Sequence, residues 1–168
     1  SYFQIFEDMR EIQMVDLKAQ YEKIGPESDE AIKSVLVSTA FIKGPDVKLF
    51  EEELQKYMGV KHVVSCANGT DALYLAMMAL GLKPGDEVIT TNFTFIATVE
   101  VVALLGLKLV IVDPDQETFN ISIAAVKKAI TSRTKVIVPV HLFGQCADME
   151  RLIELASKHD LYVIEDAA

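Results

Sequence analysis

The stretch 108-KLVIVDPDQETFNISIAAVKKAITSRTKVIVPVH-141 decides the fold class. It begins and ends with the short apolar runs 108-KLVIVD-113 and 135-KVIVPVH-141, which carry apolar side chains on both faces of an extended chain. Strands that are buried on both faces are typical of parallel sheets. Between them, 122-SIAAVKKAI-130 is predicted as a helix that Ser122 caps. The order strand, helix, strand predicts a parallel sheet covered by helices.

The same alternation continues on both sides of this stretch. We expect further helices at 45–59, 71–80, 95–106 and 148–160. We expect further strands at 62–66, 87–91 and 161–166. The helix at 71–80 is expected to be largely buried, and Asp148 is expected to cap the last helix. The sequence therefore predicts an α/β sandwich.

The composition excludes several classes of protein. With 168 residues, 51% of them hydrophobic, the chain can build one domain with a sizeable core. A net charge of −9 argues against non-specific binding to nucleic acid or to an acidic membrane, and leaves a small phosphorylated ligand open. The apolar runs are too short to span a membrane, and the start of the chain does not have the pattern of a secretory signal. We expect a soluble cytoplasmic protein.

The cysteines and the first residues carry little information on function. Cys66 and Cys146 lie far apart, and no Cys or His spacing suggests a metal site. We expect both to be small buried apolar residues in a reducing compartment, not reactive thiols. Residues 1–12 form a leader, in which Ser1 to Gln4 resemble a purification-tag linker and Met9 is near the expected natural start. Native sequence is the alternative.

Polar residues follow the predicted strands, where ligands of open α/β sheets bind. These strand ends are 65–70, 90–95, 113–115, 139–145 and 165–168. At 68-NGTD-71 a helix begins, and its free N–H groups could hold a phosphate, with Gly69 allowing close approach and Thr70 adding a hydroxyl. The alternative is simple capping by Asn68 or Thr70. Neither the G-x-G-x-x-G nor the G-x-x-x-x-G-K-[ST] pattern of nucleotide sites is present.

Acidic and aromatic side chains occupy the other strand ends. Asp166 ends a strand, and a carboxylate in a ligand crevice needs a partner, such as the protonated ring nitrogen of pyridoxal phosphate. The alternative is an ordinary turn residue, and Glu165 must point to the opposite side. Phe93 and Phe95 could stack on a flat cofactor or belong to the core. His141 is interpreted as a structural histidine and not as a base.

Several runs together resemble the large domain of DegT/DnrJ-type sugar-nucleotide aminotransferases, which are aspartate-aminotransferase-like enzymes of fold type I. The resemblance covers Gln13 to Ala168. The matching runs are 15-VDLKAQY-21, 42-IKGPDVKLFEEEL-54, 65-SCANGTDAL-73, 84-PGDEVIT-90, 94-TFIAT-98, 139-PVHLFGQCADM-149 and 163-VIEDAA-168. Within this family, the third and sixth runs most resemble aminotransferases that act on UDP-2-acetamido-3-oxo-glucuronate.

The resemblance implies a fold, a cofactor and a reaction. The fold would be a three-layer sandwich with a mostly parallel sheet, and the cofactor pyridoxal 5'-phosphate. Gly69, Thr70 and Asp71 would hold the cofactor phosphate, Phe95 would stack on its ring, and Asp166 would pair with its ring nitrogen. A cytoplasmic homodimer would transfer an amino group from glutamate to a nucleotide-linked keto-sugar, in the synthesis of bacterial surface polysaccharides such as lipopolysaccharide.

The chain departs from the family pattern at its end. Family members hold the cofactor as a Schiff base on a lysine downstream of the E-D-A-A run, and the sequence stops at Ala168. None of the lysines near strands or turns is a credible substitute, namely Lys83, Lys108, Lys127, Lys128, Lys135 and Lys158. The resemblance therefore implies a fragment without the small C-terminal domain, expected to be inactive alone and to self-associate through uncovered sheet edges and apolar faces.

Three other functions stay open at this point. Some relatives replace the lysine with histidine and dehydrate sugars, and the residue that decides lies past Ala168. A non-catalytic module that binds a nucleotide sugar is a second alternative. An NAD-dependent enzyme is disfavoured because the glycine pattern is missing.

Overall fold

A computed structural model describes residues 15–168 of the chain. The predicted leader, residues 1–12, and the expected start near Met9 lie outside the described residues. The chain divides after Ser65 into two compact units, each of which is described by itself. No helix within residues 15–168 has the length and apolar character that crossing a membrane requires.

The first unit contains two helices, α1 (Leu17–Ser38) and α2 (Pro45–Met58). Asp16 caps α1 by accepting a hydrogen bond from the Ala19 N–H at 2.9 Å. The prediction of a helix at 45–59 is confirmed, because α2 begins with a proline and ends at Gly59, whose φ of 67° suits glycine. Helix α1 was not predicted from the sequence.

The strand predicted at 62–66 is wrong. Within the described residues this segment has no ladder partner and forms no strand. The N–H and the hydroxyl of Ser65 donate instead to the Glu51 carboxylate, the N–H at 2.8 Å. A β-branched run becomes a strand only where a neighbouring strand satisfies its backbone groups, so composition alone misleads here.

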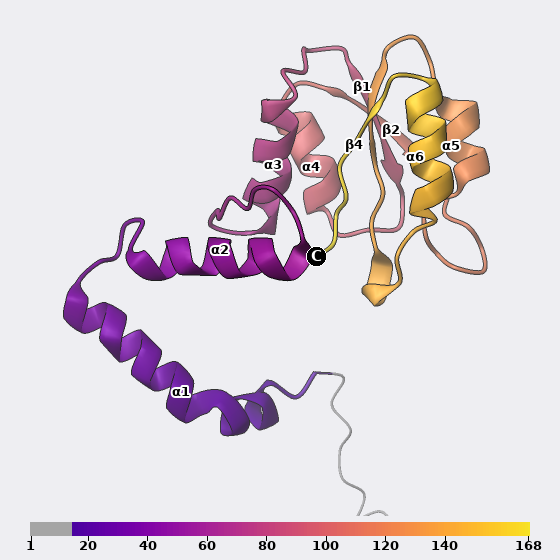
Figure 1. The fold of residues 1–168 in the computed structure, drawn as a ribbon. Helices are drawn as coiled ribbons and strands as arrows, with labels where there is room; N and C mark the ends of the chain where they lie inside the picture. Colours follow the sequence, from indigo (N-terminus) through magenta and orange to yellow (C-terminus); the bar gives the residue numbers. More distant parts are fainter. Residues whose placement is uncertain (1–14) are drawn as a thin grey trace, which may run out of the picture. The chain divides into compact units, whose positions relative to one another are not determined.

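The second unit is built on a parallel sheet of four strands in the order β2-β1-β3-β4 (Figure 1). The strands are β1 (Glu87–Thr91), β2 (Lys108–Val112), β3 (Thr134–Val138) and β4 (Tyr162–Val163). The helices are α3 (Gly69–Ala79), α4 (Ala97–Leu104), α5 (Ile123–Ala129) and α6 (Met149–Lys158), with a 3₁₀ turn at Leu142–Gly144. Strand β4 is shorter than predicted, and an isolated bridge between Val140 and Asp166 follows it.

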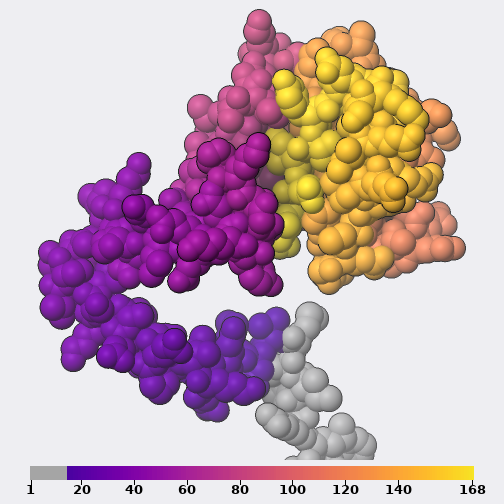
Figure 2. All heavy atoms as spheres, in the orientation of Figure 1, coloured from indigo at the N-terminus to yellow at the C-terminus, as the bar shows by residue number. Residues whose placement is uncertain are grey.

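Alternation along the strands divides the core into two apolar clusters. Val88, Val136 and Val138 face α3 and α4, whereas Ile89 and Ile137 face α5 and α6. Figure 1 shows α3 and α4 on one side of the sheet and α5 and α6 on the other, and Figure 2 shows the second unit as a closely packed body of atoms. The predicted three-layer sandwich is confirmed.

Two expectations about burial need correction. Helix α3 buries only Leu73 and Met77, while Leu75 and Met78 are about half exposed, so it is not largely buried. Strand β2 pairs with β1 alone among the described residues, which leaves Ile111 half exposed. Burial on both faces is found for β3, which has strands on both sides.

A buried acid lies at the amino end of the sheet. Glu87, the first residue of β1, is 1% exposed, and its Oε1 lies 3.0 Å from both Lys108 Nζ and Arg133 Nη2. The hydroxyl of Thr131 donates to the other carboxylate oxygen. The Thr131 hydroxyl and then the Lys108 ammonium lower the pKa of Glu87 from its ordinary 4.5 to about 2. The ionised carboxylate therefore stabilises the sheet at neutral pH.

We expect Glu87→Gln to lower the Tm at pH 7 by several degrees, because it leaves Lys108 and Arg133 without their anion. A folded pKa below the ordinary value means that this stabilisation is present above pH 4.5 and is lost as the pH falls toward 2. The Tm difference between wild type and variant should therefore shrink between pH 5 and 2, as followed by circular dichroism. Glu154→Gln, which removes an exposed pair with Lys158, is the control and should change Tm little. A Tm difference that is constant with pH would contradict the prediction.

Candidate functional site

The sheet has a switch in its winding between β1 and β3. From β1 the chain passes through α4 to β2 on one side, and then through α5 to β3 on the other side of β1. The loops that leave β1 and β3 therefore run to opposite faces, and ligands of open α/β sheets bind in the crevice that this opens.

A cavity of about 390 Å³ lies at this switch. Its lining includes Gly69, Thr70, Phe95, Leu142, Phe143 and Asp166. Four of the five predicted site residues thus meet in one place, although they come from the start of α3, the loop after β1 and the end of the chain. Asp71 is not among the lining residues, and neither is any lysine within the described part of the chain.

The start of α3 combines the two predicted roles of 68-NGTD-71. Asn68 Oδ1 accepts the Asp71 N–H at 2.9 Å, and Asn68 Nδ2 donates to Asp71 Oδ2 at 3.2 Å. Asn68 is therefore the cap, not Thr70. The N–H groups of Gly69 and Thr70 have no hydrogen-bond partner among the described residues. An added Cβ at Gly69 would meet no atom within 4 Å, so the backbone there is open to a ligand.

Asp166 is the most constrained residue of the cavity. Its N–H donates to the Pro139 carbonyl and its carbonyl accepts from the His141 N–H, both at 2.9 Å, which fixes its backbone to the end of β3. The residue is 7% exposed, and its Oδ2 accepts from the Thr98 hydroxyl at 2.6 Å. Within residues 15–168, no cationic side chain forms an ion pair with it.

The two phenylalanines after β1 have different surroundings. Phe95 is 75% exposed and lines the cavity, so it is not a core residue. Phe93 does not line the cavity but packs against Phe119 and Phe143, with ring centroids 5.8 and 6.4 Å apart. Phe143 also lines the cavity and has a φ of 53°, a left-handed conformation that bulky residues rarely adopt.

His141 is a structural residue, as predicted. Its Nδ1 accepts the Ala147 N–H at 3.2 Å, which leaves Nε2 to carry the proton and to donate to Glu165 Oε2 at 2.9 Å. The ring thereby ties the loop after β3 to the end of β4. Glu165 is exposed whereas Asp166 is buried, which is consistent with the expected opposite directions of the two side chains.

The sequence analysis did not single out Thr94 and Thr98, whose hydroxyl oxygens lie 2.9 Å apart next to Asp166. Their spacing of four residues within 94-TFIAT-98 is the available signal, because such residues lie on one face where a helix begins.

Both cysteines are exposed, so the expectation that they are buried is wrong. Cys66 follows the segment that fails to join the sheet, and its thiol donates to the Asn68 carbonyl at 3.3 Å. Cys146 lies in the loop between the 3₁₀ turn and α6. Both side chains therefore remain exposed, although cysteine is one of the residue types that are most often buried in folded proteins.

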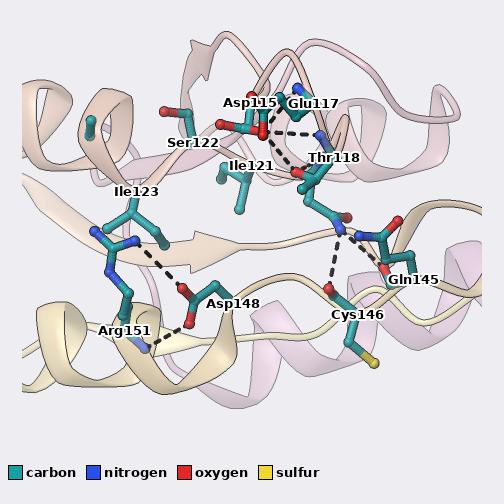
Figure 3. Close-up of a pocket in the computed structure, with 12 residues that line it drawn as sticks. Asp115, Glu117, Thr118, Ile121, Ser122, Ile123, Gln145, Cys146, Asp148 and Arg151 are labelled. Atoms are coloured by element: carbon teal, nitrogen blue, oxygen red, sulfur yellow. Dashed lines mark hydrogen bonds and ion pairs between the residues drawn. The ribbon is translucent and has the colours of Figure 1, made fainter.

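A larger hollow, of about 490 Å³, lies beside the loop that follows β2 (Figure 3). Arg151 Nη1 lies 3.6 Å from Asp148 Oδ2, and Asp115 Oδ1 accepts the backbone N–H groups of Thr118 and Glu117. These bonds, that of Thr118 first, lower the pKa of Asp115. None of the predicted site residues lines this hollow, so we place the site in the smaller cavity.

Known proteins resemble this chain over most of its length. Residues 22–168 match the model of the DegT/DnrJ/EryC1/StrS aminotransferase family. The chain is 50% identical over 157 residues to the UDP-2-acetamido-2-deoxy-3-oxo-D-glucuronate aminotransferase of Pseudomonas aeruginosa. The matched region covers 94% of this chain and 44% of that protein. The chain thus spans less than half the length of this curated relative.

Solved structures share the fold. The crystal structure of DesV from S. venezuelae superposes with a TM-score of 0.92 at 42% identity, over 95% of this chain and 43% of that one. The E. coli GDP-4-keto-6-deoxy-D-mannose-3-dehydratase, solved with bound hydrated pyridoxal phosphate, gives a TM-score of 0.78 at 33% identity, over 83% of this chain and 37% of that one.

Proposed function

Because the chain belongs to the DegT/DnrJ/EryC1/StrS aminotransferase family, we propose that its cavity binds pyridoxal 5'-phosphate and that the full-length protein transfers an amino group to a nucleotide-linked keto-sugar. The buried carboxylate of Asp166, which has no cationic partner among the described residues, is the observation that carries the proposal.

The residues present fit this cofactor. A protonated ring nitrogen would give Asp166 the cation that a buried carboxylate requires. The free N–H groups of Gly69 and Thr70 and the positive end of the α3 dipole suit the phosphate. The Asp71 N–H is already bonded to Asn68, so we expect Asp71 to act through the cap, beside the phosphate and not on it.

In this arrangement each protein group has a definite task. When bound, pyridoxal phosphate draws electron density from the carbon that carries the amine. Asp166 would keep the ring nitrogen protonated, the start of α3 would hold the phosphate, and Phe95 would stack on the ring and exclude water from it.

The name of one relative supports the proposed substrate. The Pseudomonas aeruginosa relative is named for a UDP-linked 3-oxo sugar, and we propose a UDP-linked keto-sugar as acceptor and glutamate as donor. We further propose a cytoplasmic homodimer that acts in the synthesis of bacterial surface polysaccharides, including lipopolysaccharide.

The test uses full-length protein with pyridoxal phosphate, glutamate and a UDP-linked 3-keto-sugar. We expect an absorbance band of bound cofactor, and equal amounts of 2-oxoglutarate and aminated sugar by mass spectrometry. Loss of water from the sugar without amination would favour a dehydratase, the chemistry in the name of the E. coli neighbour. Binding of the sugar nucleotide without cofactor or turnover would favour a non-catalytic module.

Phe95→Leu should raise the Kd for pyridoxal phosphate roughly two- to tenfold, because an aliphatic side chain cannot stack on the ring. Absorbance titration of the cofactor-free full-length protein measures this. Phe119→Leu removes an exposed aromatic ring that does not line the cavity and should leave the Kd unchanged. An equal loss of affinity in both variants would mean that Phe95 does not contact the cofactor.

A further inference from the structure

A chain of two threonine hydroxyls leads to the carboxylate of Asp166. Thr98 is 1% exposed, and its Oγ1 lies 2.6 Å from Asp166 Oδ2. Thr94, half-buried at the cavity wall, places its Oγ1 2.9 Å from that of Thr98. Thr98 lies in the first turn of α4, and Thr94 lies in the loop that precedes this helix.

The number of protons that each hydroxyl can donate fixes the direction of the two hydrogen bonds. A threonine hydroxyl has one proton to donate, and the Thr98 proton goes to the carboxylate. The Thr94 hydroxyl must therefore donate to Thr98. Each donation polarises the next, so the Thr98 hydroxyl is a better donor to Asp166 than an isolated one would be.

This bond determines how Asp166 can meet a ligand. With Oδ2 held by Thr98, rotation of the carboxylate is restricted, and among residues 15–168 Oδ1 has only the distant Ala168 N–H at 3.3 Å as partner. Oδ1 thus has the remaining acceptor capacity, on a residue that lines the cavity. Without the hydroxyl, the carboxylate could rotate and would also lose its donor in a buried position.

We propose that Thr98 is a positioning residue, which orients and polarises Asp166 for the ring nitrogen of the cofactor. The inference rests on the proposed function, since it assumes that pyridoxal phosphate occupies the cavity. Thr98 itself does not line the cavity and acts through Asp166.

The experiment compares two ligands in full-length, cofactor-free protein: pyridoxal phosphate, and its analogue in which a C–H group replaces the ring nitrogen. Wild type should bind pyridoxal phosphate more tightly than the analogue. Thr98→Val keeps the shape but removes the hydroxyl, and should reduce this preference roughly tenfold while the Kd of the analogue stays unchanged. Thr98→Ser, which keeps the hydroxyl, should retain the preference.

The outcomes separate this inference from the proposed function. Wild type that binds neither ligand would overturn the proposed function. Two outcomes would overturn only the role of Thr98, given a wild type that prefers pyridoxal phosphate over the analogue. In one, Thr98→Val shows the same preference. In the other, Thr98→Val loses equal affinity for both ligands. If Thr98→Val does not fold by circular dichroism, Thr94→Val decides, because it removes the preceding donor. A preference reduced about threefold supports the relay, and an unchanged preference overturns it.

Discussion

Asp166→Asn should lower the kcat of the full-length protein roughly a hundred- to a thousandfold, with little change in the secondary structure. An asparagine side chain is nearly the same size and can still accept from Thr98, but it has no charge to hold a proton on a ring nitrogen. The loss of one preorganised charge at a developing charge has effects of this size in other enzymes. Release of 2-oxoglutarate from glutamate under saturating cofactor measures the change.

Asp160→Asn is the matched control. Asp160 is exposed and precedes β4, so it lies at the amino end of the strand whose other end leads to Asp166. The same substitution there should leave kcat within about twofold of wild type, as for surface changes away from a site. A wild-type rate for Asp166→Asn would remove Asp166 from the mechanism and, with it, the main support for the cofactor site.

The largest effect on stability is expected from Ile137→Ala, a loss of about 2–5 kcal/mol in the free energy of unfolding. Ile137 is fully buried in the central strand β3 and packs with the residues of α5 and α6. Truncation removes the transfer free energy of the side chain and leaves a void in a core that can relax only in part. Urea unfolding followed by circular dichroism measures the change.

Ile153→Ala makes the same deletion on the outer side of α6, where the side chain is 50% exposed. It should cost well under 1 kcal/mol, because little apolar surface is lost from the core and alanine favours helix. Equal losses for the two variants would mean that the packing between the sheet and α6 does not set stability.

Periodicity predicted the fold class because it reports burial directly. The isoleucine and valine residues of β3 are buried on both faces, and α5 and α6 begin at their predicted caps, Ser122 and Asp148. The errors fall where burial depends on a neighbour that local sequence does not specify. The segment 62–66 has strand composition without a strand to pair with in the described residues, and α3 has apolar residues on a face that no other element of the second unit covers.

The candidate site was predictable to a similar degree. Glycine and polar residues mark the strand ends and the start of the helix at Asn68, so both could be located from the sequence. The winding of the sheet then brings Gly69, Phe95 and Asp166 together. The contact between Thr98 and Asp166 could not be predicted, because it depends on the rotamer of a hydroxyl and on two segments 68 residues apart.

The pairing of Asp166 with the end of β3 has a consequence for sequence drift. The acid is held there by the carbonyl of Pro139 and the N–H of His141. Any residue could supply the carbonyl at position 139, and any residue other than proline could supply the N–H at position 141. Side chains in this turn can therefore diverge between related proteins without displacing the carboxylate. The position of the acid thus depends little on the side chains of this turn, whereas the hydrogen bond to its carboxylate depends on the Thr98 hydroxyl.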